Sequence, residues 1–349
     1  MTGLAVRLAS WDDDPPLGGQ GVYLRELRRA LEAGGVQVST VAGRGTWAVP
    51  YPTVTGRGHL DLSVHLNRHL DLLTAGDPDV IHVSGGPGGL QLLRQVDRPV
   101  VYTAHHTHRQ SPGWPTLRRL LARLERRSYQ LADKVVAVSP STADAVVAMG
   151  VAADKVAVIS PGVAVPDLTS GPQRVPGRLL FVGRLEPEKG PLHAVAAMRL
   201  VIEAVPGAHG HVVGGGSLAP AVRAAARGAP ITVTGRVDDA AVDRELRQAQ
   251  VVLLPSAFEG LGLVALEAMA AGACVVGYDV AGLHDTIGCR GELVPAGQVG
   301  ALADACVRLL GDDELRRQRG DAGRRAVAEE RSWDRCADEL KALYRSLVC

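Results

Sequence analysis

Hydrophobic residues occur along the chain as short continuous runs separated by longer segments of helical periodicity. The clearest example starts with the apolar run VVLL at 251–254, which a glycine-containing loop follows at 255–260. A helix-favouring segment at 263–271 comes next and ends at Gly272, and a second apolar run occupies 274–276. Short apolar runs bounded by turn residues predict buried strands, and a glycine after a periodic segment predicts a helix end. The pattern therefore predicts a strand–loop–helix–strand unit of a parallel sheet.

The same alternation extends over the whole chain and predicts an α/β fold with two halves. Proline-containing sequence with little apolar periodicity separates the halves, and we take 166–177 as the linker. The expected domains are 1–165 and 178–330, followed by a last helix within 331–349. Expected strands are 4–8, 36–41, 79–83, 99–104, 135–138, 156–159, 178–182, 211–213 and 231–233, together with the two above. Further expected helices are 22–33, 60–73, 115–131, 139–149 with Ser141 as N-cap, 300–310, 313–329 and 333–347.

Composition narrows the class of protein. A chain of 349 residues is long enough for two ordinary domains, and a net charge of +1 with 3% aromatic residues argues against a nucleic-acid partner. Five cysteines without paired spacing are typical of a reducing compartment. We therefore expect a cytoplasmic protein with neither a signal peptide nor a membrane-spanning helix.

Two acids frame the stretch that follows the run at 251–254. Glu259 lies in the loop and Glu267 lies eight residues later on the expected helix. Gly260 and Gly262 allow the backbone to approach a ligand closely, and the amides of 261–264 at the helix start suit an anion such as phosphate. Glu267 would then be placed to accept hydrogen bonds from a ribose. The alternative is a capping acid and a solvated helix acid.

A second group of candidates follows the expected strand at 178–182. Arg184 and Lys189 lie five residues apart around a turn and can point at the same anion, although two exposed cations would give the same pattern. Glycine-rich loops at 18–21 and 84–89 also follow expected strands, where a phosphate or sugar is commonly bound. The loop at 18–21 is equally consistent with a simple turn.

The stretch FEGLGLVALEAMAAGACVV, with glutamates spaced E-x7-E, resembles the signature of the retaining GT-B nucleotide-sugar glycosyltransferases of family 4, the glycosyl transferases group 1. The segment GRLEPEKG at 183–190 resembles the GR-L-x-x-x-KG block of the same family. The resemblance implies a GT-B fold, in which two Rossmann-like domains face a central cleft and the C-terminal helix, 331–349, crosses back to the first domain. Leu261 departs from the family, which usually has an aromatic residue there.

The resemblance also implies roles for particular residues. Glu259 would face the donor sugar and diphosphate, Glu267 would hold the ribose, and Arg184 and Lys189 would bind the diphosphate. Arg236 and Val237 would present their backbone to the base, and His105 would line the face of the transferred sugar. The implied catalytic residues are His105, Glu259, Arg184 and Lys189. The other implied donor contacts are Gly18, Gly19, Gly260, Leu261, Gly262 and Leu263, and the acceptor contacts are Asp13, Gln20, His82 and His106.

The expected activity is transfer of a hexosyl or N-acetylhexosaminyl unit with retention, without a metal or other cofactor, because the two cations supply the charge that the leaving diphosphate needs. A double displacement with Glu259 as nucleophile is an open alternative. So are a GT-B epimerase or phosphorylase and a noncatalytic nucleotide-sugar binder. Histidines at 105, 106 and 108 invite a zinc site, but no carboxylate or cysteine completes a ligand set, and we expect none.

The acceptor is less sharply defined. Asp12, Asp13 and Asp14 in the first loop would attract a cationic aminocyclitol or amino sugar, or else form a solvated acidic turn. We expect a UDP-sugar donor and a small soluble acceptor in secondary metabolism. The alternative is a lipid or cell-envelope acceptor, since the helix expected at 115–131 carries five arginines on one side and leucines on the other and could lie on an anionic membrane. The sequence leaves the oligomeric state open.

Overall fold

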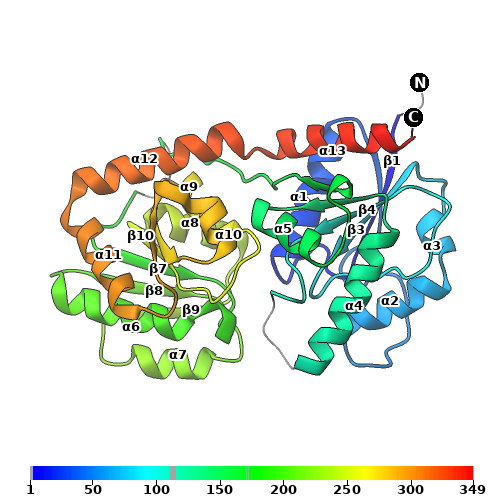
Figure 1. The fold of residues 1–349 in the computed structure, drawn as a ribbon. Coiled ribbons are helices and arrows are strands. Elements are labelled where there is room, and N and C mark those ends of the chain that lie inside the picture. Colours follow the sequence, from blue (N-terminus) through cyan, green and yellow to red (C-terminus); the bar gives the residue numbers. More distant parts are fainter. Residues whose placement is uncertain (1–2, 111–114, 170, 172, 349) are drawn as a thin grey trace. The chain divides into compact units, whose positions relative to one another are not determined.

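The structure is a computed structural model that describes residues 3–110, 115–169, 171 and 173–348, without the side chains of 115 and 116. The chain divides into two compact units (Figure 1). Unit 1 consists of Met1–Gly162 and Arg331–Cys349, and unit 2 consists of Val163–Glu330. Each unit is described here by itself.

Unit 1 is built on a parallel six-stranded sheet of order β2-β1-β3-β4-β5-β6. Its strands are β1 Ala5–Ser10, β2 Gln37–Ala42, β3 Val80–Gly85, β4 Val100–Ala104, β5 Lys134–Ala137 and β6 Val156–Val158. Every residue of β3 and β4 is buried, as expected for central parallel strands covered by helices on both faces, and this burial explains why apolar residues predominate in them.

The helices of unit 1 cover both faces of this sheet. They are α1 Gly19–Ala33, α2 Gly58–Arg68, α3 Asp71–Thr74, α4 Pro115–Leu131, α5 Pro140–Ala148, the 3₁₀ turn η1 Ala153–Lys155 and α13 Trp333–Val348. The C-terminal helix α13 packs against α1 (Figure 1). One apolar core joins the sheet to α1 and α13 through residues such as Leu27 and Leu340, and the other joins it to α2 and α4 through residues such as Leu62 and Tyr129.

Unit 2 contains a second parallel sheet, of order β12-β11-β10-β7-β8-β9. Its strands are β7 Arg178–Val182, β8 His209–Val213, β9 Ile231–Gly235, β10 Val251–Leu254, β11 Cys274–Tyr278 and β12 Glu292–Val294. Counted within the unit, this is the order 3-2-1-4-5-6 of the Rossmann fold. Its helices are η2 Pro187–Lys189, α6 Pro191–Ala204, α7 Ala219–Ala226, α8 Asp239–Gln248, α9 Leu263–Ala270, α10 Ala281–Ile287, η3 Gly288–Arg290, α11 Val299–Gly311 and α12 Asp313–Glu330. The predicted fold class, with two Rossmann-like α/β domains, is therefore confirmed.

Several local predictions need correction. Helix α1 starts at Gly19 instead of residue 22, so most of the GGQG segment forms its first turn, with Gly18 as N-cap. The helix expected at 60–73 is two helices, α2 and α3. The N-cap of α5 is Ser139, whose hydroxyl accepts a hydrogen bond from the Thr142 amide at 3.2 Å, so the prediction of Ser141 was wrong.

Gly272 does end helix α9, as predicted. It has a φ of +70°. The Gly272 amide donates to the carbonyl of Met269 and the Ala273 amide to that of Ala268, which is the hydrogen-bond pattern of a glycine-terminated helix.

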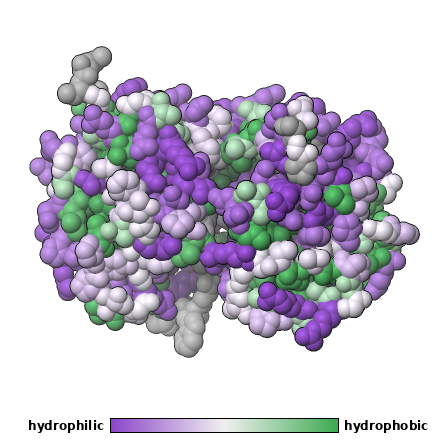
Figure 2. All heavy atoms as spheres, turned by 180° about the vertical axis from the view of Figure 1, so that it is seen from behind, coloured by the Kyte–Doolittle hydropathy of each residue, from purple (hydrophilic) through white to green (hydrophobic). Residues whose placement is uncertain are grey.

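On the face shown in Figure 2, hydrophilic and hydrophobic residues are interspersed. Among the helices that the structure describes, none combines the length and the hydropathy needed to span a lipid bilayer.

Candidate functional site

In unit 2, the predicted cation Lys189 contacts the predicted acid Glu259. Lys189 Nζ donates to Glu259 Oε1 at 2.6 Å, and the Ser256 hydroxyl donates to the same oxygen at 2.9 Å. Lys189 follows β7 and Glu259 follows β10, which are neighbouring parallel strands. The two side chains, 70 residues apart in sequence, therefore meet at the carboxyl edge of the sheet, where doubly wound folds bind ligands.

Close backbone packing holds these two loops together. Gly190 has a φ of +62°, and a Cβ atom at this position would lie 2.1 Å from the carbonyl oxygen of Pro255. The Ala257 amide also donates to the carbonyl of Glu188 at 2.8 Å. Only glycine fits at 190, because a side chain there would separate the loop that carries Lys189 from the loop that carries Glu259.

Arg184 precedes Lys189 in the same loop and has a different partner. Its guanidinium donates to Glu188 at 2.7 Å, and its side chain is 55% exposed. Exposed ion pairs contribute little free energy, so an incoming phosphate could compete with Glu188 for this arginine. The prediction that Arg184 and Lys189 bind one anion remains a proposal. In the structure the two cations contact two different carboxylates.

The segment from 260 to 267 forms the start of α9. Gly262 is the N-cap with a φ of +87°, and the first turn begins with hydrogen bonds from the amides of Ala265 and Leu266 to its carbonyl. Amides at such a helix start favour an anion. The Leu261 side chain is buried and its carbonyl accepts a hydrogen bond from Thr286, so the departure from the aromatic residue of the family lies inside the unit.

The remaining predicted donor contacts lie around this loop pair. Leu263 and Glu267 are half-buried on α9, and Gly260 is buried in the loop that precedes this helix. Arg236 is exposed and Val237 half-buried after β9, which is two strands away from β7 in the sheet.

In unit 1, His105 follows β4 and is held on two sides. Its Nε2 forms a hydrogen bond of 3.2 Å with the hydroxyl of Ser84 from β3, and its ring meets that of Tyr23 from α1 with centroids 4.8 Å apart and planes at 84°. Although His105 keeps some exposed surface, burial of its ring lowers its pKa to about 4. The imidazole is therefore neutral at pH 7.

The glycine-rich loops of unit 1 meet beside His105. Gln20 donates from its side-chain amide to the carbonyl of Pro87 at 2.9 Å, which joins the start of α1 to the loop after β3. Gly86 has a φ of +86°, and a Cβ atom there would lie 2.5 Å from the carbonyl oxygen of His106. Gly18, Gly19, Gln20 and the half-buried His106 are thus grouped around the carboxyl ends of β1, β3 and β4.

The acidic loop that contains Asp12, Asp13 and Asp14 was expected either to attract a cationic acceptor or to form a solvated turn, and the structure differs from both expectations. Asp12 is 6% exposed and Asp13 is completely buried, so the alternative of a solvated acidic turn is wrong for these two residues. Asp12 accepts hydrogen bonds from the amides of Leu17 and Gly18 at 2.9 and 3.2 Å and pairs with Arg44. Asp13 pairs with Arg28 at 3.1 Å. Their charges organise the loop and are already balanced by arginine.

His82 is also enclosed. It is 3% exposed, its Nδ1 is hydrogen-bonded to the Tyr344 hydroxyl, and its Nε2 to the Thr103 hydroxyl at 2.6 Å. Burial, with a smaller contribution from His105, lowers its pKa to about 3. A direct acceptor contact by Asp13 or His82 would require breaking these pairs, because neither side chain reaches the surface of unit 1.

Metal binding finds no support in the described residues, among which no group of three or more histidine, cysteine, aspartate or glutamate side chains could hold an ion. His108, the third histidine of the motif, instead forms a hydrogen bond of 3.1 Å with the buried Glu125.

Sequence reasoning missed the residues that support the site. Ser256 holds Glu259, and Tyr23, Thr103 and Tyr344 lie behind His105 and His82. In the sequence, Tyr23, Thr103 and Tyr344 lie within hydrophobic periodicity and carry no motif. Only contacts between distant segments identify them.

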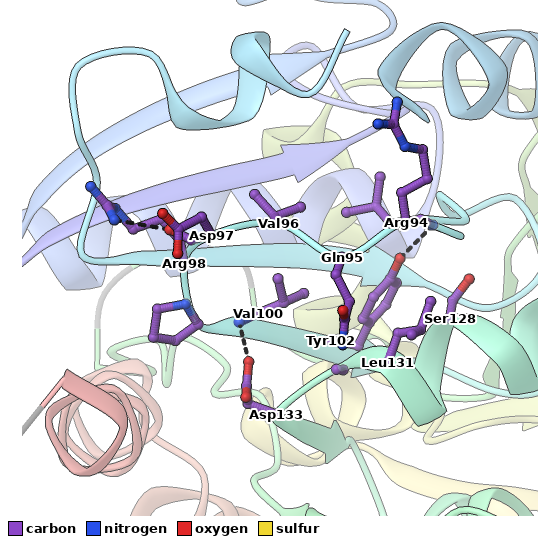
Figure 3. A pocket seen from close by; sticks show the side chains of 13 residues that line it. Arg94, Gln95, Val96, Asp97, Arg98, Val100, Tyr102, Ser128, Leu131 and Asp133 are labelled. Carbon is purple, nitrogen blue, oxygen red and sulfur yellow. Dashed lines mark hydrogen bonds between the residues drawn. The ribbon is translucent and has the colours of Figure 1, made fainter. Parts of the chain in front are cut away.

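A separate pocket lies at the amino-terminal ends of strands in the unit 1 sheet, opposite the ends that carry the predicted site residues (Figure 3). Residues that precede β4 and β5 line it, among them Arg94, Asp97, Arg98 and Asp133. Within it, the Val100 amide donates to Asp133 and the Leu92 amide donates to the Tyr102 hydroxyl. None of the predicted site residues lies there, because the predicted residues follow the carboxyl ends of the strands.

Two doubly wound parallel domains, with glycine-rich and basic loops at the strand ends, define the class of two-domain GT-B proteins. The model of Glycosyltransferase Family 4 matches residues 17–165 and that of Glycosyl transferases group 1 matches residues 176–312. The phosphatidyl-myo-inositol mannosyltransferase of Mycobacterium leprae is 30% identical over 95% of this chain and 94% of its own. The chain belongs to glycosyltransferase family 4.

Two further relatives extend this picture. The D-inositol 3-phosphate glycosyltransferase of Paenarthrobacter aurescens is 30% identical over 95% of this chain and 93% of its own. Sucrose-phosphate synthase from Thermosynechococcus elongatus has the same fold, with a TM-score of 0.80 over 99% of both chains and 23% identity. The protein is a nucleotide-sugar glycosyltransferase.

Proposed function

We propose that this glycosyltransferase transfers a hexosyl or N-acetylhexosaminyl unit from a UDP-sugar to a hydroxyl of a small polar acceptor, with retention and without a metal ion. The proposal further places the reaction in the cytoplasm and in secondary metabolism; free cysteines at 274, 289, 306 and 336 fit a reducing compartment. The observation that carries the donor site is the Lys189–Glu259 contact at the carboxyl edge of the unit 2 sheet, beside the start of α9.

Unit 2 would stabilise the leaving diphosphate. Lys189, already fixed by Glu259, would place its charge against one phosphate, and Arg184 would leave Glu188 to offer its planar fork to the other. The amides at the start of α9 add a fixed positive potential. These groups supply positive charge where negative charge develops, which is the basis for proposing independence from a metal. Glu267, Arg236 and Val237 are proposed for the ribose and the base.

The contacts of Glu259 favour front-face transfer over a covalent intermediate. Its Oε1 accepts hydrogen bonds from both Lys189 and Ser256, and these bonds stabilise the carboxylate and reduce its nucleophilicity. In front-face transfer the departing phosphate takes the acceptor proton. His105, neutral at pH 7, would contribute a hydrogen bond to the sugar from the imidazole and would carry no charge.

The acceptor is proposed to be a polyol bound by unit 1. Because Asp12 and Asp13 are buried against arginines, the acidic loop offers a cationic aminocyclitol or amino sugar only the partly exposed Asp14. The two curated relatives both carry inositol in their names, one as a lipid and one as a phosphate. A cyclitol is therefore the first acceptor to test, with Gln20 and His106 as the proposed contacts.

A lipid-linked acceptor is the second candidate, because of the outer face of α4. Arg119, Arg123, Arg126 and Arg127 are exposed there, next to Leu117 and Leu120, which are 36% and 52% exposed. Each arginine near an anionic bilayer contributes about 1 kcal/mol of binding. Sedimentation with phosphatidylglycerol vesicles, but not with phosphatidylcholine vesicles, that is lost in Arg119→Glu/Arg123→Glu would favour this candidate.

The donor site is tested by thermal shift with UDP, GDP, dTDP and their sugars in EDTA. A ligand at 100 times its Kd adds about 2.7 kcal/mol to the stability of the native state. We expect one nucleotide to give a clear shift that Lys189→Ala and Glu267→Ala reduce, whereas Arg317→Ala, an exposed pair with Glu314 on α12, leaves it unchanged. Absence of any shift at millimolar ligand would refute the donor site. A shift that requires Mg²⁺ would refute metal independence.

A further inference from the structure

A buried chain of polar side chains runs through unit 1 from the C-terminal helix to the strand that ends at His105. The Tyr344 hydroxyl of α13 is hydrogen-bonded to His82 Nδ1 on β3. His82 Nε2 is 2.6 Å from the Thr103 hydroxyl on β4, which lies 3.2 Å from the Tyr23 hydroxyl on α1. These four residues come from four separate elements, and each is at most 3% exposed.

Each of the three hydrogen bonds in this network has a donor available. Each of the three hydroxyls and the neutral imidazole of His82 carries one donor, so three donors fill the three hydrogen bonds and one terminal hydroxyl proton is left over. When no hydroxyl accepts twice within this network, the donors all point the same way, from Tyr344 to Tyr23 or the reverse. Loss of one hydroxyl would therefore leave a buried nitrogen or oxygen unpaired and release the constraint on its neighbours.

Tyr23 connects this hydrogen-bond network to His105, because its ring packs against the His105 ring. The ring of Tyr23 meets the ring of His105 nearly at a right angle, with centroids 4.8 Å apart. The orientation of Tyr23 is fixed at its hydroxyl by Thr103 and at its ring by Trp333 of α13, whose centroid is 5.8 Å away. His105 has its other support in Ser84. Two side chains of the C-terminal helix thus stabilise the aromatic wall against which His105 rests.

We propose that Tyr344 is a positioning residue for the transfer reaction, acting through His82, Thr103 and Tyr23 to hold the His105 ring in its productive orientation. The inference rests on the proposed role of His105 beside the transferred sugar. It means that α13, which lies some 230 residues after His105 in the sequence, helps to position the His105 side chain in unit 1. Neither Tyr344 nor Tyr23 is proposed to contact a substrate.

The test compares kcat and KM of purified variants of the whole chain, with the proposed UDP-sugar as donor and a cyclitol as acceptor. Tyr344→Phe keeps the ring and removes the hydroxyl, and we expect kcat to fall about 5- to 30-fold with donor KM unchanged, because misplacement of a reacting group costs rate more than binding. Thr103→Val should act similarly, and Thr103→Ser, which retains the hydroxyl, should restore most of the activity.

Tyr102→Phe is the matched control. Tyr102 neighbours Thr103 on β4 but its hydroxyl accepts from the Leu92 amide in the other apolar core of unit 1. This variant loses a buried hydrogen bond of the same kind, so we expect it to lose stability without a change in kcat. Thermal melts of all variants establish that each is folded at the assay temperature.

A double-mutant cycle with His105→Ala separates the possible failures. If Tyr344 acts through His105, Tyr344→Phe has no further effect on kcat in the His105→Ala background. An undiminished effect in that background, or an equal fall in kcat for Tyr102→Phe, would overturn the inference. Unchanged kcat in Tyr344→Phe, with a large fall in His105→Ala, would also overturn it. Unchanged kcat in His105→Ala itself would instead refute the proposed role of His105.

Discussion

His82 should make the stability of unit 1 depend on pH in a way that one substitution removes. The side chain is 3% exposed, and burial lowers its pKa to about 3 from an ordinary 6.5. In the unfolded chain the same imidazole titrates near 6.5, so below this pH the unfolded state binds a proton that the native state does not. The resulting stability is fully present above about pH 6.5 and is lost as the pH falls toward 3.

The magnitude follows from the difference between the two pKa values. Between pH 6.5 and pH 5.0, protonation of His82 stabilises the unfolded state relative to the native state by about 1.4 kcal/mol per pH unit, or about 2 kcal/mol in all. Lowering the pH from 7.5 to 5.0 should reduce the free energy of unfolding of both proteins. We expect the reduction to be about 2 kcal/mol smaller in His82→Gln than in the wild-type protein. His105, whose pKa is about 4, adds a similar pH dependence that remains in this variant.

The assay is urea unfolding followed by tryptophan fluorescence at the two pH values. Trp11, Trp47 and Trp333, the tryptophans that the structure describes, belong to unit 1, so their fluorescence reports on this unit. Tyr102→Phe serves as the control, because it removes a buried hydrogen bond without removing a group that titrates in this range. An identical pH dependence in His82→Gln and wild type would refute the argument that His82 stays neutral in the native state.

Two further predictions test local structure. Ser139→Ala should destabilise unit 1 by about 1 kcal/mol through loss of the α5 N-cap, and Ser141→Ala by less, as measured by the same fluorescence unfolding; equal losses would contradict the cap assignment. Gly190→Ala should lower the free energy of unfolding by more than about 2 kcal/mol and weaken donor binding, because of the positive φ at this position and its contact with Pro255. Gly228 also has a positive φ, but nothing lies within 4 Å of an added Cβ, so Gly228→Ala should cost about 1 kcal/mol. Calorimetry of the two variants measures this difference.

The order of strands and helices was predictable because hydrophobic periodicity is a local property. The fully buried parallel strand β10 has an uninterrupted apolar sequence, apolar residues predominate in β3 and β4, and Gly272 ends α9 by a local backbone preference. Element ends were less accurate. The start of α1 was placed three residues late because glycines at 19 and 21 are typical of turns, whereas in the structure both are helical, and Gly21 lies so close to Asp12 and Pro16 that a Cβ atom there would clash with them.

The candidate site divides in the same way. Lys189, Glu259, Glu267 and His105 were proposed from motifs, since their types and spacing are visible in the chain. Asp12, Asp13 and His82 were assigned to solvent or to an acceptor because a sequence does not show which charged side chains find a buried partner. Arg44, Arg28 and Tyr344, which provide these partners, lie 32, 15 and 262 residues away.

The sequence by itself thus determined the α/β class, the two-half organisation and the residues whose chemistry suits a nucleotide sugar, because these depend on composition, periodicity and short motifs. Only the tertiary structure decided which of the charged and polar residues are exposed and which support others. That outcome depends on strands and helices far apart in sequence meeting in one core, where each buried polar group must find a partner. The contact of Lys189 with Glu259 and the chain from Tyr344 to Tyr23 both arise in this way.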